Sequence, residues 1–457
     1  MLLETIKSKG LAHSSYYLSD GGEAAVIDPR RDCKIYVEIA THECSEIRYI
    51  FETHRNEDYV IGSVELQEMT NAEICHSKET AFRYGKHVLS DGESFRIGRL
   101  NIEAIHAPGH TLDSMCFAVY DGEAWDKPLM VFSGDTLFVG DVGRTDLPGL
   151  DLWEDMSKKL YDSLHAKILP LGDNVLLYPS HTAGSVCGSL ISDREMSTIG
   201  FERITNPQLK LDREEFVENR LKNKMLRPPY FKRMENWNLN GPLLLNDQPK
   251  PQPLNTHQFE AEWKKQDSII VDTREPDTFV GSHIPGSINI WLDGVSFFPG
   301  WIIDYDKQIL LLTERNEDVE VAITYLHRIG FDNIAGYLCS PFKVWRNEGK
   351  SIETLGTISA IDTKKMLESK DLLLLDVREE SEWEAGHIGG AKRIYVGHLQ
   401  KDADKLPKDK PIVITCTWGG RAGLAASILK RRGFEEVYNL LGGMNAWENL
   451  GYPLSKD

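Results

Sequence analysis

The chain has 457 residues, of which 41% are hydrophobic and 27% are charged, and these values exclude a disordered or fibrous protein. The length corresponds to about three domains. Lys and Arg number 52 against 70 Asp and Glu, so the net charge of −18 disfavours nucleic acids and anionic membranes as partners. No apolar run approaches the roughly 18 residues of a transmembrane helix, and no signal-peptide pattern is present, so we expect no membrane partner.

Seven cysteines are dispersed along the chain, an odd number without a C-x-x-C pair. They are Cys33, Cys44, Cys75, Cys116, Cys187, Cys339 and Cys416. This usage is typical of a reducing compartment, where most thiols are buried small side chains and a single one can be reactive. We therefore expect a cytoplasmic protein.

Residues 1–245 predict an α/β domain with a strong β character. Short segments rich in β-branched and aromatic residues alternate with turns, and several of these predicted strands end directly in a histidine or an aspartate. Residues 212–240 are instead charged and aromatic, which favours an amphipathic helix packed on the domain. The alternative for this segment is a wall over an active site that brings Arg and Lys to the substrate.

Four predicted strands end in residues that commonly bind metals. Their ends read Thr53-His54, Pro108-Gly109-His110-Thr111, Ser133-Gly134-Asp135-Thr136 and Pro179-Ser180-His181-Thr182. Loops at neighbouring strand ends converge into one site. Two imidazoles and one carboxylate with open positions form the facial triad typical of non-haem Fe(II), although zinc uses similar groups. We therefore predict a metal held by His54, His110 and Asp135.

The order of these motifs resembles that of the metallo-β-lactamase superfamily, whose first motif is T-H-x-H-x-D-H. Residues 53–59 read THRNEDY, so Asn56 and Tyr59 replace two of the three histidines. Hydrolases of the superfamily activate water between two metals, and these replacements disfavour such a pair. The retained positions hold a single iron in the persulfide dioxygenase branch. The resemblance implies an αββα sandwich and one Fe(II) per chain, with zinc as the alternative metal.

Four further residues are candidates for supporting roles in this branch. Gly143-Arg144-Thr145-Asp146 resembles a segment whose arginine lies near the thiol substrate, so Arg144 is a candidate for binding a carboxylate or phosphate of that thiol. The alternative is a surface arginine that closes a turn. Cys187 either lines the metal pocket or is a buried, inert thiol. Asp58 and His181 are candidates for orienting the ligands or for binding a second metal.

Residues 246–254 contain three prolines among polar residues and predict a linker. The sequence then repeats itself in two copies, which we place at residues 255–352 and 357–457. Three framework residues recur at a constant spacing of 104: Asp272, Arg274 and His283 match Asp376, Arg378 and His387. Short apolar strands alternate with helical patterns in each copy, which predicts two small α/β domains with parallel sheets covered on both faces.

The second copy contains the strongest candidate nucleophile. Cys416 lies between a buried predicted strand and a helix that begins near Arg421, in the segment CTWGGR. Backbone N–H groups and the positive helix end favour a thiolate and would hold an anionic persulfide, while Arg421 adds a cation. The loop and the framework motifs resemble those of rhodanese sulfurtransferases. A cysteine loop that ends in arginine also occurs in protein tyrosine phosphatases, which is a more distant alternative.

The first copy differs at the same positions. Thr313 stands where the second copy has Cys416, and Asp318 stands where it has Arg421. Threonine cannot form a persulfide, and the acidic residues in this loop repel anions. We expect this copy to be silent in sulfur transfer, and the nearby Cys339 is no substitute because it lies in a different segment.

Taken together, the resemblances imply a persulfide dioxygenase fused to an inactive and an active rhodanese domain. O2 would oxidise a low-molecular-weight thiol persulfide at iron to sulfite and thiol, and Cys416 would pass sulfane sulfur to sulfite to give thiosulfate. The implied role is sulfide or persulfide detoxification. The carrier thiol and association with further copies of the chain are left open. Two alternatives are a zinc thioester hydrolase of the glyoxalase II type with a sulfurtransferase domain, and a sulfurtransferase with a degenerate metal domain.

Overall fold

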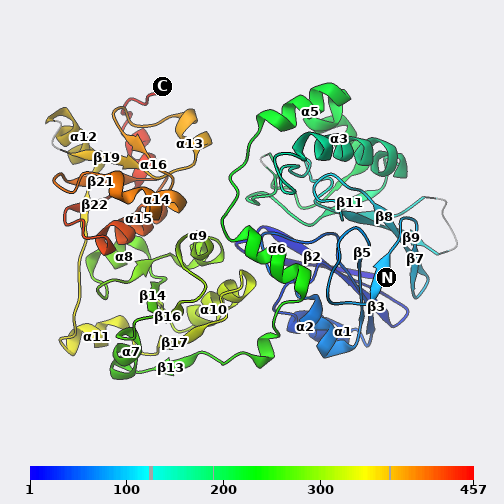
Figure 1. The fold of residues 1–457 in the computed structure, drawn as a ribbon, viewed down its shortest axis with the longest axis horizontal. Helices are drawn as coiled ribbons and strands as arrows, with labels where there is room; N and C mark the ends of the chain where they lie inside the picture. Colours follow the sequence, from blue (N-terminus) through cyan, green and yellow to red (C-terminus); the bar gives the residue numbers. More distant parts are fainter. Residues whose placement is uncertain (123–126, 189, 370–371, 457) are drawn as a thin grey trace. The chain divides into compact units, whose positions relative to one another are not determined.

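The computed structural model describes residues 1–122, 127–188, 190–369 and 372–456. The chain forms two compact units, one of residues 1–247 with 327–330 and one of residues 248–326 with 331–457. Each unit has its own sheets and its own hydrophobic cores (Figure 1). Among the described residues, no helix is both long enough and apolar enough to cross a bilayer.

The first unit contains two sheets, each of six strands among the described residues. The order in one sheet is β1 (Leu2–Ser8), β2 (His13–Asp20), β3 (Glu23–Ile27), β4 (Glu46–Phe51), β5 (Glu73–Ser77) and β6 (His87–Leu89). The order in the other is β12 (Ser197–Thr198), β11 (Leu176–Pro179), β10 (Met130–Gly134), β9 (Met115–Asp121), β8 (Leu100–His106) and β7 (Ser94–Ile97). Both sheets are mixed, since parallel pairs such as β3–β4 and β10–β11 occur beside antiparallel ones.

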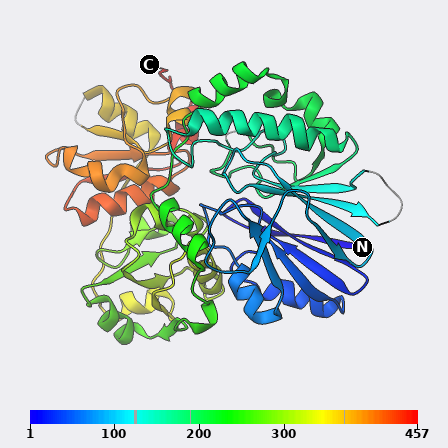
Figure 2. The same cartoon turned by 45° about the vertical axis from the view of Figure 1, so that its right-hand side comes forward.

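The two sheets face each other across a hydrophobic core, and helices cover their outer faces (Figure 2). Alternate residues of β2 and β9, such as Tyr16 and Leu18 or Phe117 and Val119, enter this core because side chains of a strand alternate between its faces. The outer helices are α1 (Lys34–His42) and α2 (Ser63–Thr70) on one sheet, and α3 (Trp153–Ser163), α4 (Ile199–Thr205) and α5 (Arg213–Lys222) on the other side. The predicted αββα sandwich is confirmed.

The charged, aromatic segment 212–240 forms two helices, α5 and α6 (Phe231–Asn240). Phe216 of α5 lies in the core under the second sheet, as expected of a packing helix. In α6, Asn238 donates from Nδ2 to the carbonyl oxygens of Asn56 and Tyr59, at 2.7 and 2.8 Å. This helix therefore also holds the loop that follows His54.

The second unit contains two sheets of five described strands with the same order. They are β13 (Gln252–Leu254), β17 (Ile334–Leu338), β16 (Gln308–Leu312), β14 (Ser268–Asp272) and β15 (Ile288–Asn289), and β18 (Gly356–Ile358), β22 (Val437–Leu440), β21 (Ile412–Thr415), β19 (Leu373–Asp376) and β20 (Lys392–Arg393). All of these neighbours pair in parallel. The residues expected as a linker, 246–254, end in β13, so its last three residues join a sheet.

Helices cover both faces of each parallel sheet. In the first copy they are α7 (Thr256–Trp263), α8 (Pro276–Gly281), α9 (Pro299–Ile302), α10 (Asp318–Arg328) and α11 (Phe342–Asn347). In the second copy they are α12 (Ala360–Ser369), α13 (Glu380–Ala385), α14 (Leu399–Asp402), α15 (Gly420–Arg431) and α16 (Gly443–Asn449). The two copies thus repeat one α/β architecture, and the predicted fold class is confirmed.

The repeated framework residues stabilise the ends of β14 and β19, the second strand of each copy in chain order. Arg378 binds the Asp376 carboxylate and donates to the Gly386 carbonyl oxygen at 2.8 Å. Arg274 binds Asp272 and the Ser282 carbonyl oxygen in the same way, at 2.6 and 2.9 Å. The pairs are buried, so they hold the turn after each strand rather than offering charge to a substrate.

Candidate metal centre and sulfur-transfer loop

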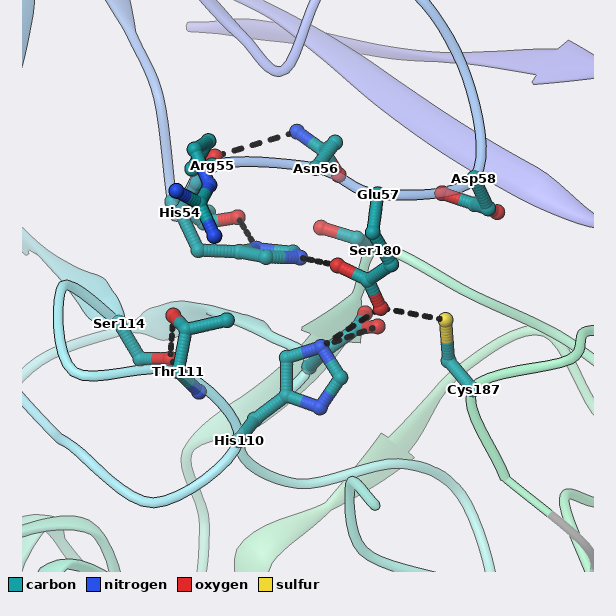
Figure 3. Close-up of polar contacts among 12 residues, drawn as sticks. His54, Arg55, Asn56, Glu57, Asp58, His110, Thr111, Ser114, Ser180 and Cys187 are labelled. Carbon is teal, nitrogen blue, oxygen red and sulfur yellow. Dashed lines mark hydrogen bonds and ion pairs between the residues drawn. The ribbon is translucent and has the colours of Figure 1, made fainter. Parts of the chain in front are cut away.

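The candidate metal ligands lie together because they follow the ends of neighbouring strands. His54 follows β4, His110 lies between β8 and β9, Asp135 follows β10 and His181 follows β11. Each of these four side chains is at most 3% exposed. Figure 3 shows His54 and His110 on either side of the Glu57 carboxylate, with Cys187 beside it.

His54 is oriented by a short hydrogen-bond chain. The Thr53 hydroxyl donates to Asp28 at 2.6 Å and lies 2.9 Å from His54 Nδ1. Since this hydroxyl is already a donor to Asp28, it accepts from Nδ1–H, and His54 Nε2 keeps its lone pair. Asp28 also accepts from Ser180 Oγ at 2.7 Å, so one buried carboxylate fixes the strand ends of both sheets.

His110 is oriented in the same way as His54, with Nδ1 as the donor. Its Nδ1 donates to the Arg144 carbonyl oxygen at 2.8 Å, which leaves Nε2 with a lone pair. Neither His54 Nε2 nor His110 Nε2 has a hydrogen-bond partner within the described parts of the chain, although both are buried. His110 Nε2 lies 3.5 Å from Asp135 Oδ2. Two buried imidazole lone pairs near a carboxylate fit a divalent metal, because unsatisfied buried polar atoms are otherwise costly.

His181 is occupied by two carboxylates. Its Nδ1 lies 2.8 Å from Asp135 Oδ1 and its Nε2 lies 3.0 Å from Asp58 Oδ2. Although burial disfavours a charged imidazole, Asp135 and Asp58 raise the pKa of His181 well above its ordinary value. His181 therefore orients Asp135 and is itself held by Asp58. Together with Cys187, Asp58 and His181 form a further group of side chains whose atoms could hold a metal.

The Cys416 loop lies between β21 and α15, at the carboxyl end of a parallel sheet. Cys416 is 1% exposed, and its Sγ accepts the Gly419 N–H at 3.1 Å. Four residues separate it from Arg421, which lies in the first turn of α15. Gly419 has φ +127°, a conformation that is strained for residues with a side chain, so glycine lets the loop turn back over the sulfur.

Matches to known proteins cover both units. The metallo-beta-lactamase superfamily model matches residues 9–181, and the rhodanese-like domain model matches residues 255–348 and 359–450. The human mitochondrial persulfide dioxygenase ETHE1 is 31% identical over 212 residues, which are 45% of this chain and 74% of the human protein. Thiosulfate sulfurtransferase GlpE of Coxiella burnetii is 32% identical over 91 residues, 20% of this chain and 85% of that protein.

A crystal structure described as a metallo-beta-lactamase from Staphylococcus aureus subsp. aureus COL covers 74% of this chain and 98% of its own, with 29% identity and a TM-score of 0.66. The chain belongs to the metallo-β-lactamase superfamily. Its first unit is homologous to persulfide dioxygenases, and two rhodanese-like domains follow. The predicted fusion architecture is confirmed.

The chain departs from the superfamily motif at two positions. Asn56 replaces a histidine and donates from Nδ2 to the His54 carbonyl oxygen at 3.2 Å. Tyr59 replaces another, and its hydroxyl lies 2.9 Å from His13 Nε2. Glu57, whose carboxylate lies between the two candidate histidine ligands, is not among the residues predicted from the sequence. The sequence contained a signal for Glu57, because this acidic residue stands between positions 56 and 58, two ligand positions of the motif.

Cys187 and Arg144 are both buried next to the candidate metal centre. Cys187 Sγ donates to Glu57 Oε1 at 3.4 Å, and burial, with nearby carboxylates, raises the pKa of this thiol well above its ordinary value. Arg144 donates to Asp146 twice at 2.7 Å and to three carbonyl oxygens of Val186, Met225 and Leu226. All five N–H donors of Arg144 are used within the fold, so the geometry favours an arginine that holds a turn.

In the rhodanese-like domain that carries Cys416, Glu382 is likewise not among the residues predicted from the sequence. Arg421 Nη2 donates to Glu382 Oε1 and to Thr417 Oγ1, both at 2.7 Å. Burial opposes the charge of Arg421, but the Glu382 carboxylate raises the pKa of Arg421 above its ordinary value. Comparison of the two copies could have indicated this pair, because the first copy has Thr278 in place of Glu382 and Asp318 in place of Arg421, so both partners change together.

The first rhodanese-like domain touches the Cys416 loop of the second one. The Trp291 and Trp418 rings meet edge to face with centroids 5.5 Å apart. A Cβ added to Gly420 would lie 3.1 Å from the Trp291 ring. Asn289 N–H donates to Ser427 Oγ at 3.2 Å, which joins β15 to α15. The first rhodanese-like domain therefore packs against the loop that carries Cys416.

Proposed function

We propose that this enzyme oxidises a low-molecular-weight thiol persulfide with O2 and converts the product to thiosulfate. His54, His110 and Asp135 would hold one Fe(II), and Cys416 would transfer sulfane sulfur. The supporting observation is the pair of buried imidazole lone pairs beside Asp135, each with its Nδ1 already hydrogen-bonded. When bound, Fe(II) would supply the O2 chemistry. The overall reaction balances as persulfide, O2 and water giving thiol, sulfite and two protons.

A single metal is favoured by the two motif positions that have lost their histidines. In a dinuclear centre these positions would supply imidazole ligands, whereas Asn56 donates to the His54 carbonyl oxygen at 3.2 Å. Tyr59 is engaged with His13. A zinc thioester hydrolase that activates water between two metals is therefore the less favoured function.

Cys416 would act in two balanced steps. Its thiolate attacks the outer sulfur of a second persulfide, which forms a cysteine persulfide and releases the carrier thiolate. Sulfite then attacks that outer sulfur, which releases thiosulfate and restores the Cys416 thiolate. The Gly419 N–H is placed to hold negative charge on sulfur throughout.

We also propose a cytoplasmic setting and a role in sulfide or persulfide detoxification. All seven cysteines are free thiols, as expected in a reducing compartment. The partners would be the thiol persulfide, O2, sulfite and thiosulfate. Both chemistries on one chain raise the local concentration of the sulfite that they share.

The deciding experiment measures metal content and oxygen uptake with persulfides of glutathione and coenzyme A, together with sulfite and thiosulfate. We expect one iron per chain and oxygen consumption that depends on a persulfide. Two zinc ions with thioester hydrolysis would support the hydrolase instead. Sulfur transfer by protein that binds no metal would support a degenerate first unit.

A further inference from the structure

We propose that Glu57 is a fourth protein ligand of the metal, which makes the centre a site of two histidines and two carboxylates. The inference rests on the assignment of His54, His110 and Asp135 in the proposed function. Glu57 occupies a variable position of the superfamily motif, between His54 and Asp58, so the motif alone does not assign it.

The distances match those between ligands of one metal. Glu57 Oε1 lies 3.3 Å from His110 Nε2, and Asp135 Oδ2 lies 3.5 Å from the same nitrogen. Two atoms bound to one ion at about 2.0–2.2 Å are roughly 2.8–3.6 Å apart at octahedral or tetrahedral angles. Glu57 Oε2 lies 3.9 Å from His54 Nε2, so a small closing movement brings this pair into the same range.

Burial shows that this carboxylate needs a cation. Glu57 is 1% exposed, and its Oε2 has no hydrogen-bond partner in the part of the chain that the structure describes. The Cys187 thiol donates to Oε1, but it carries no positive charge in its protonated form. Burying a carboxylate costs several kcal/mol unless it is paired, and a divalent metal between Glu57 and the two imidazoles would remove that cost.

A fourth protein ligand changes the net charge of the metal centre and the number of positions that stay open for substrates. Two neutral imidazoles and two carboxylates neutralise a divalent ion, whereas the triad alone leaves one positive charge. In a six-coordinate ion with Glu57 bound through one oxygen, two positions stay open, enough for one sulfur and one O2. An added carboxylate oxygen is a hard ligand. It therefore favours Fe(II) or Mn(II) over the soft metals that thiolate sites select, such as Cu(I).

The opposite role for Glu57 is a plug, in which the carboxylate pairs with the imidazoles in place of a metal. The two roles predict effects of opposite sign. Removal of a ligand weakens metal binding, whereas removal of a plug strengthens it. Titration of the full-length chain with Co(II), followed by calorimetry and by the visible absorption of the bound ion, separates them.

We expect Glu57→Gln to raise the Kd for Co(II) at least tenfold and to change the intensity of the visible bands, because the coordination number falls. Glu57→Asp keeps the charge but withdraws the oxygen atoms, so it should also weaken binding and alter the spectrum. The matched control is Glu52→Gln, a buried carboxylate that accepts from Tyr84 at 2.9 Å and should bind Co(II) like the parent.

The inference is overturned if folded Glu57→Gln and Glu57→Ala bind Co(II) as tightly as the parent or more tightly, with an unchanged spectrum. It is also overturned if Glu57→Asp behaves like the parent, since charge alone would then account for the effect. His110→Ala distinguishes the two proposals. Loss of Co(II) binding in this variant beside normal binding by Glu57→Gln rejects only the role of Glu57, whereas normal binding by His110→Ala rejects the centre itself.

Discussion

At the scale of single residues, function depends on which polar atoms the fold leaves available. His54 and His110 each donate from Nδ1 and keep Nε2 for a metal, whereas both nitrogens of His181 are engaged. The motif resemblance assigns His54 and His110 to the metal and leaves His181 to orient the ligands or to bind a second metal. The hydrogen-bond partners of the second ring nitrogen decide which of them can bind a metal.

Cys416→Ser tests the division of labour between the two units. A serine hydroxyl is not ionised near pH 7 and cannot form a persulfide, while the metal ligands are untouched. We expect this variant to consume oxygen with a thiol persulfide at the parent rate and to release sulfite instead of thiosulfate. Cys187→Ser, run beside it, should still make thiosulfate. Thiosulfate formed at the parent rate by Cys416→Ser would reject Cys416 as the transfer thiol.

The Arg421–Glu382 pair predicts a pH-dependent contribution to stability. Burial opposes the charge of Glu382, but Arg421 lowers the pKa of this carboxyl in the folded protein below its ordinary value of about 4.3. The contribution is therefore present above about pH 4.3 and is lost as the pH falls through the folded pKa. Glu382→Gln should destabilise the rhodanese unit by about 1 kcal/mol at pH 7, since the pair is partly exposed.

Urea denaturation of the parent and Glu382→Gln at several pH values checks this. The two proteins should converge in acid, where the parent carboxyl is also neutral. A difference that is equal at pH 7 and below pH 4 would show that the charge of Glu382 is not what stabilises the loop.

At the scale of elements, the two rhodanese-like domains show how one architecture is kept while the residues of one loop change. Both have the same strand order and the same buried Asp–Arg pair at the end of the second strand, β14 or β19. The loop after β16 instead has Thr313, whose hydroxyl donates to the Arg315 carbonyl oxygen at 2.9 Å. Strand pairing depends on the apolar core, so the loop can change without loss of the fold.

Thr313→Ala is therefore expected to leave oxygen uptake, sulfite release and thiosulfate formation unchanged. Thr313 has no thiol to offer, and its hydrogen bond is local to the loop. Steady-state rates with a thiol persulfide are the measurement. A large loss of turnover in correctly folded Thr313→Ala would show that the silent domain takes part in the chemistry.

Trp291→Ala tests a structural role of the silent domain instead. Its ring packs on Trp418 and against Gly420, both in the loop that carries Cys416. We expect the variant to transfer sulfur about tenfold more slowly while oxygen uptake stays at the parent rate. Phe297→Ala, a nearby aromatic change that leaves Trp291 in place, is the control. Parent-like transfer by Trp291→Ala would mean that the loop needs no support from this ring.

At the scale of the whole molecule, the chain joins two units whose candidate sites share no residue. The metal ligands come from residues 54–135, and the transfer loop comes from residues 416–421. Each unit has its own cores. The two chemistries should therefore be separable by single substitutions.

His110→Ala provides the complementary test. Loss of one imidazole from the proposed centre should abolish both iron binding and persulfide-dependent oxygen uptake. Sulfur transfer from thiosulfate to cyanide through Cys416 should remain at the parent rate. Retention of one iron per chain by His110→Ala, or two tightly bound zinc ions in the parent, would contradict the proposed centre.

The sequence by itself determined the architecture and the choice of candidate residues. Short apolar strands, the repeat at a spacing of 104 and the histidines at strand ends are local patterns, so they can be read without knowledge of the fold. The repeat also predicted which rhodanese-like loop lacks a thiol, since the comparison of Thr313 with Cys416 needs only an alignment of the two copies.

Only the tertiary structure decided how these side chains are used. Loops that are distant in the sequence meet in space at three places. They bring Glu57 next to the His110 imidazole, Glu382 to Arg421, and five acceptor atoms to Arg144. A side chain's identity states which hydrogen bonds it can make, but burial decides which of them it must make. That is why Arg144, a candidate substrate anchor in the sequence, directs all five of its side-chain N–H donors to acceptors within the fold.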